Sequence, residues 1–291
     1  MLPNFIVIGA AKAGTTALYW YLAEHPDVFM SPVKETNFFA YGVDQQGRLL
    51  WGNPDVHRFP IKSLSEYEAL FAEAGGAAAV GEASTMYLEC PQAAGRIRAL
   101  IPEARIICAL RHPVDRAYSD YQMYLRNRGR RLQPERDLAA GAAWASPDSH
   151  WMRIGRYHDP LSRYFEAFPR DHVHVFLFDD LKREALRVVQ DLYRFLGVEP
   201  EFVPDFDTPH NVGGMPASPM LERLLVKSPL KTVLEPLVPQ GATNWLRRLR
   251  TRTMRQAPSL PAPLRAELTR SFHDDIAATS RLIGRDLAHW L

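Results

Sequence analysis

This chain has few cysteines, no long apolar stretch and only a small net charge. It contains two cysteines, Cys90 and Cys108, too few for a disulfide framework, and Cys108 lies within an apolar run, which favours a reducing compartment. No apolar stretch approaches the ~20 residues that a membrane span requires. The N-terminal residues lack the basic segment and cleavage site of a signal peptide, so we expect a cytoplasmic protein.

The charge and the composition argue against nucleic-acid-binding, repeat and low-complexity proteins. Arginine and lysine number 35 against 33 acidic residues, a net charge of +2 that does not indicate a nucleic-acid-binding protein. We find no repeat and no low-complexity tract. High alanine, arginine and proline usage suggests a GC-rich bacterial source. At 291 residues, 46% of them hydrophobic, the chain can bury a substantial core, and we expect a single domain over residues 1–291.

The order of apolar segments predicts an α/β fold with a P-loop-like central parallel sheet flanked by helices. Short β-rich runs and amphipathic segments alternate along the chain. The expected strands cover residues 5–8, 79–80, 105–110 and 171–178, and the expected helices begin at residue 15 and cover about 181–197 and 263–282. Two long irregular stretches, about 41–65 and 205–260, are predicted to bind the acceptor or to act as lids.

The segment after the first strand resembles a phosphate-binding loop with its lysine displaced. Gly9 and Gly14 have the Walker A spacing, but Thr15 stands where that motif has lysine, and the lysine is Lys12. A strand–helix turn of this kind presents backbone N–H groups to an anion at the helix N-terminus. The predicted phosphate-binding residues are Lys12, Ala13, Gly14, Thr15, Thr16 and Ala17. A turn without any ligand is the alternative interpretation.

A second phosphate-binding element is predicted at the end of the strand over residues 105–110. In "LRHPVDRAYSDY", Arg111 ends the strand and Ser119 lies in the first turns of the next helix. A guanidinium and a hydroxyl so placed can hold a phosphate together. Because ligands bind at the carboxyl ends of parallel strands, both elements are expected to face one crevice, which suits a nucleotide with phosphates at two positions.

These motifs together resemble one family. "KAGTTAL", "PVKETNFF" and "LRHPVDRAYSDY" are similar to segments of the sulfotransferases that use 3′-phosphoadenosine 5′-phosphosulfate (PAPS), especially the heparan-sulfate-type branch and its bacterial relatives. The run from Gly155 to Val198 and the C-terminal "LIGRDLAHWL" follow the same order, so the resemblance covers nearly the whole chain. It implies that the loop holds the 5′-phosphosulfate and that no metal is required.

The resemblance also implies roles for individual residues. Glu35 stands at the place of the family's catalytic base, with Lys34 beside it to orient the sulfuryl group or lower the carboxyl pKa. Lys12 would stabilise the leaving phosphate, and Arg111 and Ser119 would bind the 3′-phosphate. Tyr157 matches a cofactor-binding tyrosine, although a core position is the alternative. A surface ion pair is the alternative interpretation of Lys34 and Glu35.

Some family features are altered or ambiguous. In "GEASTMYL", Glu82 and Tyr87 match a heparan-type acceptor motif, but Ala83 replaces its lysine. The family's C-terminal cofactor loop corresponds to residues 250–255 or to 210–218. The arginine-rich runs at 126–131 and 247–255 are interpreted as solvated helix faces, with an anionic acceptor, a membrane surface or nucleic acid as alternative partners.

Three functional hypotheses follow. The first is a PAPS-dependent sulfotransferase acting on a hydroxyl or amine of a small molecule, glycolipid or glycan, without nucleic acid and with peripheral membrane contact left open. The second is a P-loop kinase or NTPase, against which Thr15 argues. The third is a non-catalytic nucleotide-binding module of the same fold. The sequence leaves the acceptor and the oligomeric state open.

Overall fold

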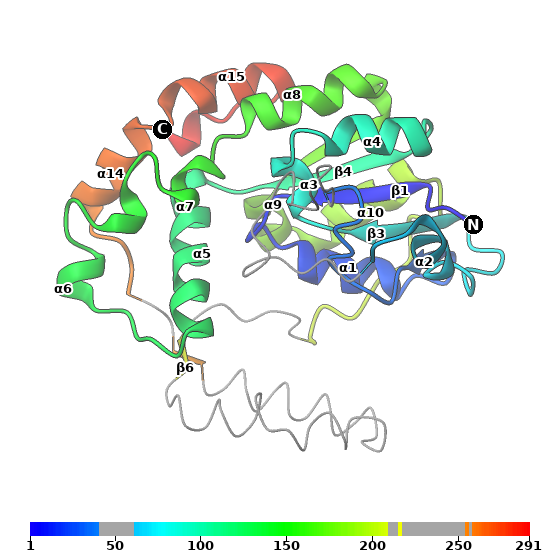
Figure 1. The fold of residues 1–291 in the computed structure, drawn as a ribbon, viewed down its shortest axis with the longest axis horizontal. Helices are drawn as coiled ribbons and strands as arrows, with labels where there is room; N and C mark the ends of the chain where they lie inside the picture. Colours follow the sequence, from blue (N-terminus) through cyan, green and yellow to red (C-terminus); the bar gives the residue numbers. More distant parts are fainter. Residues whose placement is uncertain (41–60, 209–214, 217–253, 256–257) are drawn as a thin grey trace, which may run out of the picture.

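A five-stranded parallel sheet forms the centre of the molecule (Figure 1). The computed structural model describes residues 1–40, 61–208, 215–216, 254–255 and 258–291. The strand order is β2-β3-β1-β4-β5, in which β1 is Phe5–Gly9, β2 Val28–Met30, β3 Ala79–Ala83, β4 Arg105–Leu110 and β5 Val173–Leu177. The α/β class and the parallel sheet predicted from the sequence are therefore confirmed.

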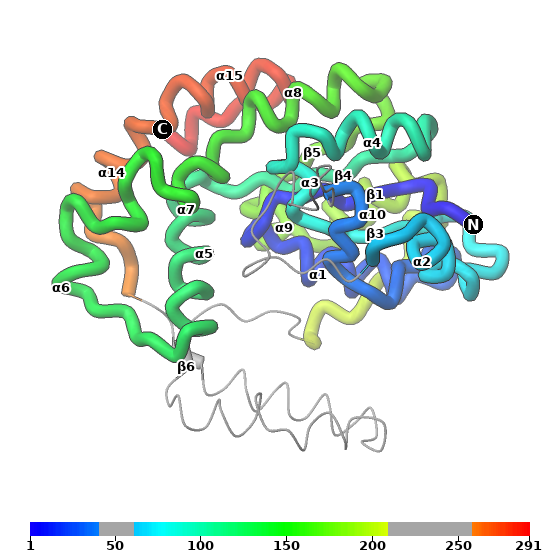
Figure 2. Tube along the Cα trace, in the orientation of Figure 1, coloured from blue at the N-terminus to red at the C-terminus, as the bar shows by residue number. Residues whose placement is uncertain are grey.

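Helices cover both faces of this sheet (Figures 1 and 2). Helices α1 (Thr15–Ala23) and α10 (Ala185–Leu196) pack against each other on one face. Helices α3 (Met86–Glu89), α4 (Ala93–Leu100) and α8 (His158–Ala167) pack together on the other. The other described helices are α2 (Leu64–Ala69), α5 (Pro113–Asn127), α6 (Pro134–Asp137), α7 (His150–Arg153), α9 (Phe178–Arg183), α14 (Ala262–Arg270) and α15 (His273–Ile283), with short 3₁₀ turns at Ala143–Ala145, Arg170–His172 and Ala288–Trp290.

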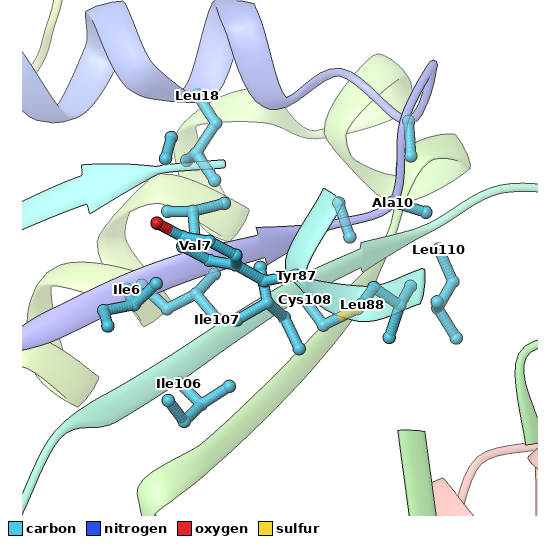
Figure 3. Packing of buried hydrophobic residues seen from close by; sticks show 14 of the residues in the cluster. Ile6, Val7, Ala10, Leu18, Tyr87, Leu88, Ile106, Ile107, Cys108 and Leu110 are labelled. Carbon is cyan, nitrogen blue, oxygen red and sulfur yellow. The ribbon is translucent and has the colours of Figure 1, made fainter. Parts of the chain in front are cut away.

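The middle of the sheet is buried on both sides, which explains its continuous apolar runs. Every residue of β1 and β3 is buried. Phe5 lies opposite Gly81, where an added Cβ would come within 2.2 Å of the Phe5 ring, so this strand position requires glycine. Figure 3 shows Tyr87 of α3 beside Val7 of β1, and Leu88 of α3 beside Cys108 of β4. Helix α3 is thereby fixed against the strand that leads into the predicted phosphate loop.

The structure corrects three elements of the sequence prediction. Strand β2 was not predicted, because three residues are too few to show a periodicity. The single helix expected over 181–197 is two, α9 and α10, separated at Glu184 by its non-helical backbone (φ −140°, ψ 54°). The helix expected over 263–282 is also two, α14 and α15, with the break at Ser271 and Phe272.

Parts of the chain predicted to bind the acceptor or to close over the cofactor lie outside the described residues. These parts are 41–60, 209–214, 217–253 and 256–257, which include most of both candidate cofactor loops. Within 205–260 the structure describes a backbone pairing of β6 (Met215–Pro216) with β7 (Met254–Arg255), antiparallel. No helix in the described ranges has the length and apolar character to cross a membrane. The single-domain assignment stays a prediction.

Candidate active site

The predicted phosphate loop has backbone N–H groups at the N-terminus of α1 that no described residue accepts. The first backbone bond of this helix runs from the Leu18 N–H to the Gly14 carbonyl, at 3.1 Å. Gly14 is the N-cap in the left-handed region (φ 87°), and no side chain caps the helix. The N–H groups of residues 14–17 consequently have no hydrogen-bond acceptor within the described part of the chain. Such a helix end is suited to an anion.

Phe178 and Arg111 close one side of this loop. A Cβ on Gly14 would lie 2.9 Å from the Phe178 ring, so glycine is required here by packing as well as by backbone angle. The Arg111 guanidinium lies 4.8 Å from the centre of the same ring, and its Nη1 donates a 3.0 Å hydrogen bond to the Lys12 carbonyl. The two predicted phosphate-binding elements are therefore in direct contact.

Lys12 occupies a strained and desolvated position in the loop. Its φ of 68° is unusual for a residue with a side chain. Its Nζ lies 3.4 Å from the Met123 sulfur on α5. Burial is the main cause that lowers the pKa of the Lys12 ammonium to about 8, while the charge of Asp120 acts in the opposite direction. An ammonium so poorly solvated gains more than an exposed one from a bound anion.

Buried side chains hold the backbone of Arg111 and His112, which directly follow β4. The fully buried Tyr157 donates its hydroxyl to the Arg111 carbonyl at 2.8 Å. The next residue, His112, accepts a hydrogen bond at Nδ1 from Val114 N–H, so its Nε2 carries the proton and donates to the Trp290 carbonyl at 3.0 Å. Tyr157 thus supports the strand end, and its contact with a cofactor stays a prediction.

Ser119 lies two turns along α5 from Arg111. Its side chain is partly exposed and makes no hydrogen bond to any residue in the described ranges. The hydroxyl is available to a ligand, and its phosphate-binding role stays a prediction.

Glu35, the predicted base, also has a positive φ, 62°. Its Oε2 accepts hydrogen bonds from the N–H (2.8 Å) and the hydroxyl (3.2 Å) of Thr85, just before α3. Its Oε1 forms an ion pair of 2.5 Å with Lys34, so the predicted neighbour contact is present. Oε2 is fully engaged, whereas Oε1 keeps a lone pair, since a carboxylate oxygen can accept two hydrogen bonds.

Glu82 holds the segment that follows Glu35. This fully buried carboxyl accepts four hydroxyl hydrogen bonds, from Thr36 (2.9 Å), Ser84 (2.7 Å), Tyr67 (2.9 Å) and Tyr87 (2.7 Å). Two of those hydroxyls accept from backbone N–H groups in turn: Ser84 from Asn37 and Tyr87 from Phe39. Burial raises the Glu82 pKa, and the hydroxyl donors oppose that shift. The network fixes the loop around Glu35, so Glu82 and Tyr87 have a positioning role here.

We expect Glu82→Gln to destabilise the protein by about 1–3 kcal/mol, because the amide NH₂ would face hydroxyls that now donate to a carboxylate oxygen. The midpoint of urea unfolding measures this loss. Glu66→Gln is a matched control, since Glu66 is an exposed carboxyl that closes the capping box of α2. Equal stability of both variants would contradict the proposed importance of the buried network.

Sequence reasoning missed three neighbours of the site. Thr85 and Glu89 lie one helical turn apart in "STMYLE", and Phe178 directly follows β5. The positions of Thr85 and Phe178 close behind strands β3 and β5 were a usable signal, whereas Glu89 ends helix α3 and had none. Their contacts depend on packing between distant segments. No group of three or more His, Cys, Asp or Glu side chains in the described ranges is arranged to hold a metal ion.

Comparison with known proteins identifies the family of this chain. The model of the "Sulfotransferase family" matches residues 3–202. A bifunctional heparan sulfate N-deacetylase/N-sulfotransferase 4 from Mus musculus is 30% identical over 214 residues, which are 69% of this chain and 23% of that protein. A Drosophila melanogaster bifunctional heparan sulfate N-deacetylase/N-sulfotransferase is 29% identical over 68% of this chain and 20% of its own length. The chain thus spans about a fifth of the length of these relatives.

Two solved structures resemble the whole chain. A sulfotransferase from Alicyclobacillus acidocaldarius has a TM-score of 0.70 and 30% sequence identity, with 100% of this chain and 99% of that chain covered. A sulfotransferase domain from the curacin biosynthetic pathway has a TM-score of 0.52 at 14% identity, with 99% of each chain covered, and supports the fold alone. Because the family model covers more than half of the sequence, the chain belongs to the sulfotransferase family.

Proposed function

We propose that this protein transfers a sulfuryl group from PAPS to a hydroxyl or amine of an acceptor, without a required metal. The observation that carries the proposal is the contact between the two phosphate elements: the Arg111 guanidinium donates a hydrogen bond to the Lys12 carbonyl, beside four N–H groups that have no acceptor among the described residues. One nucleotide with phosphates at its 5′ and 3′ positions suits such a pair of elements. Membership in the sulfotransferase family supports this choice over a kinase or a non-catalytic module.

Each residue group has a role in this proposal. The N–H groups of residues 14–17 and the side chains of Thr15 and Thr16 bind the 5′-phosphosulfate, and Arg111 with Ser119 binds the 3′-phosphate. PAPS supplies the activated sulfuryl group and a phosphate leaving group. Lys12 places its ammonium beside the oxygen on which negative charge develops. Glu35 accepts the proton of the acceptor.

The proposed acceptor is a small molecule, glycolipid or glycan. The names of the relatives given above refer to heparan sulfate, a glycan, and to N-sulfotransferase activity. The match to a small part of those proteins supports a glycan or amine acceptor as one member of this range. Their deacetylase activity is not part of the proposal.

Calorimetric titration with the bisphosphate product 3′-phosphoadenosine 5′-phosphate (PAP), with AMP and with ATP tests the cofactor. Without added metal, we expect PAP to bind much more tightly than the other two nucleotides, because only PAP carries the 3′-phosphate. Arg111→Ala should weaken PAP binding by ~10–100-fold, since it removes a hydrogen-bonded charge worth about 1.5–3 kcal/mol, and should affect AMP far less.

Arg187→Ala is the matched control, because this arginine lies on α10 and pairs with Glu184 and Asp191 at the surface. Equal losses for PAP and AMP in Arg111→Ala would refute the assignment of the 3′-phosphate. Metal-dependent ATP binding without preference for a 3′-phosphate would replace the proposal with the kinase hypothesis.

A further inference from the structure

The post-α15 segment, residues 285–291, packs back against the protein after α15 ends. Gly284 ends that helix in the left-handed region (φ 68°), which glycine adopts without strain, and so turns the chain. Leu287 and Trp290 are buried, with 0% and 3% of their surfaces exposed. The sulfotransferase family model matches residues 3–202 and does not include this segment. Two contacts with the proposed cofactor site indicate what the segment does.

The first contact joins Arg285 to α9. Arg285 Nη1 lies 2.6 Å from Oδ2 of the buried Asp180. Arg183 reaches the other oxygen, Oδ1, at 3.0 Å, but this arginine belongs to α9 itself and is mostly exposed. Burial acts to raise the Asp180 pKa, and the hydrogen bonds from Arg285 and Arg183 outweigh it, so that the pKa is lowered and the carboxyl is ionised. A buried charge depends strongly on its partners, so Arg285 holds this part of α9.

Helix α9 is also a wall of the phosphate loop. Phe178, two residues before Asp180, packs so closely on Gly14 that an added Cβ would lie 2.9 Å from its ring. The same ring carries the Arg111 guanidinium at 4.8 Å from its centre. Because α9 is a helix of only six residues, an anchor at Asp180 also restrains Phe178. The ion pair with Arg285 thereby supports the ring on which Arg111 is stacked.

The second contact joins Trp290 to the backbone that follows β4. The Trp290 carbonyl accepts the hydrogen bond of His112 Nε2 at 3.0 Å, and the centres of the two rings lie 6.0 Å apart. His112 directly follows Arg111 in the chain. The Trp290 ring also lies 6.5 Å from the ring of Tyr157, whose hydroxyl donates to the Arg111 carbonyl. The post-α15 segment therefore contacts the neighbours of both supports of Arg111, the Phe178 ring and the backbone after β4.

We propose that the post-α15 segment positions Arg111 for the 3′-phosphate of PAPS, with Arg285 as the positioning residue that links the segment to α9. This inference rests on the proposed function and adds to it a determinant of cofactor recognition outside the region that the family model matches. Arg285 acts through Asp180 and Phe178, not on the nucleotide itself. A guanidinium whose stacking ring and backbone are both held loses little freedom when it binds a phosphate, and binding is tighter for that reason.

The proposal implies a linkage between two events, the docking of the post-α15 segment and the binding of a 3′-phosphate. If the docked segment raises the affinity for the 3′-phosphate by some factor, a bound 3′-phosphate must stabilise the docked segment by the same factor. The linkage can therefore be measured from either side. AMP, which has no 3′-phosphate, should take little part in it.

Titration of Arg285→Ala with PAP and with AMP measures the linkage from the nucleotide side. We expect the affinity for PAP to fall by about fivefold or more, the lower end of typical coupling between sites, and the affinity for AMP to change by less than about twofold. Arg285→Lys should recover part of the loss, because an ammonium can still pair with Asp180. The readout is the ratio of the two affinities, since a general loss of stability would lower both together.

Two control variants separate positioning from stability. Arg183→Ala removes the other partner of Asp180 without touching the post-α15 segment, so the ratio should stay at its wild-type value. Arg105→Ala removes a 2.5 Å hydrogen bond to the Leu196 carbonyl at the opposite end of β4, so it should lower the midpoint of urea unfolding and leave the ratio unchanged. Equal losses of PAP and AMP affinity in Arg285→Ala, or the same change of ratio in Arg183→Ala, would overturn the proposal.

Hydrogen exchange of the wild-type protein measures the linkage from the segment side. At saturation, we expect PAP to slow exchange of the backbone N–H groups of residues 285–291 by about fivefold or more, and AMP to slow it far less. Arg285→Ala should lose this difference between the two nucleotides. Equal protection by PAP and AMP in the wild-type protein would contradict the positioning of Arg111 by this segment. Failure of the wild-type protein to bind PAP would instead overturn the proposed function.

Discussion

Lys12→Met is expected to lower the turnover of sulfuryl transfer by ~10²–10³-fold, because it removes the cation proposed to stabilise the leaving phosphate. Methionine keeps much of the side-chain length and can pack against Met123, which the Lys12 Nζ now contacts. Folding should be preserved, since the buried ammonium carries a desolvation cost that methionine does not. Initial rates at saturating PAPS measure the effect. A loss smaller than about threefold would contradict a role in the chemical step.

The pH dependence supplies an independent test of Lys12. Burial lowers its pKa to about 8, so in the free protein the ammonium is present below pH 8 and is lost as pH rises through that value. The ratio kcat/KM for PAPS should therefore fall above pH 8. Asp120 raises the Lys12 pKa, so Asp120→Asn should move this fall to lower pH. An unchanged profile in Asp120→Asn would assign the titration to another group.

Most of the fold could be predicted from the sequence, because the strands of a buried sheet appear as continuous apolar runs. β4 matches its predicted limits, Arg105–Leu110, since an apolar run in a parallel sheet ends where the chain reaches the polar edge. The missing elements lacked such a signal. β2 has three residues, and the break between α9 and α10 depends on the backbone conformation of Glu184, which no periodicity reveals.

The site was predictable in part for a related reason. Lys12 and Arg111 follow strands, and strands that are neighbours in a parallel sheet bring their ends together. The contacts of Glu35 were not predictable, because Thr85 reaches it from another strand connection. Two residues proposed for the chemistry, Lys12 and Glu35, have positive φ angles, a feature that sequence reasoning cannot detect without glycine or asparagine as a marker.

Glu35→Gln is expected to bind PAP as the wild-type protein does and to lower transfer by ~10²–10⁴-fold, the range for loss of a general base. Glutamine preserves the size of the side chain and can still accept the Thr85 hydrogen bonds, but it cannot take a proton. Rapid-quench measurement of a single turnover isolates the chemical step from product release. Turnover equal to that of the wild-type protein with the true acceptor would remove Glu35 from the mechanism.

Two further variants separate the chemistry of Glu35 from its placement. Thr85→Val keeps the shape and the backbone N–H but removes the hydroxyl that donates to Oε2, so it should cost only about fivefold in rate, the effect of one ordinary hydrogen bond. Glu35→Gly should be as inactive as Glu35→Gln, and because glycine adopts a φ of 62° without strain, the relief of strain should offset part of the stability that is lost with the Thr85 hydrogen bonds. Strong destabilisation of Glu35→Gly would mean that this carboxyl is retained for the structure of the loop.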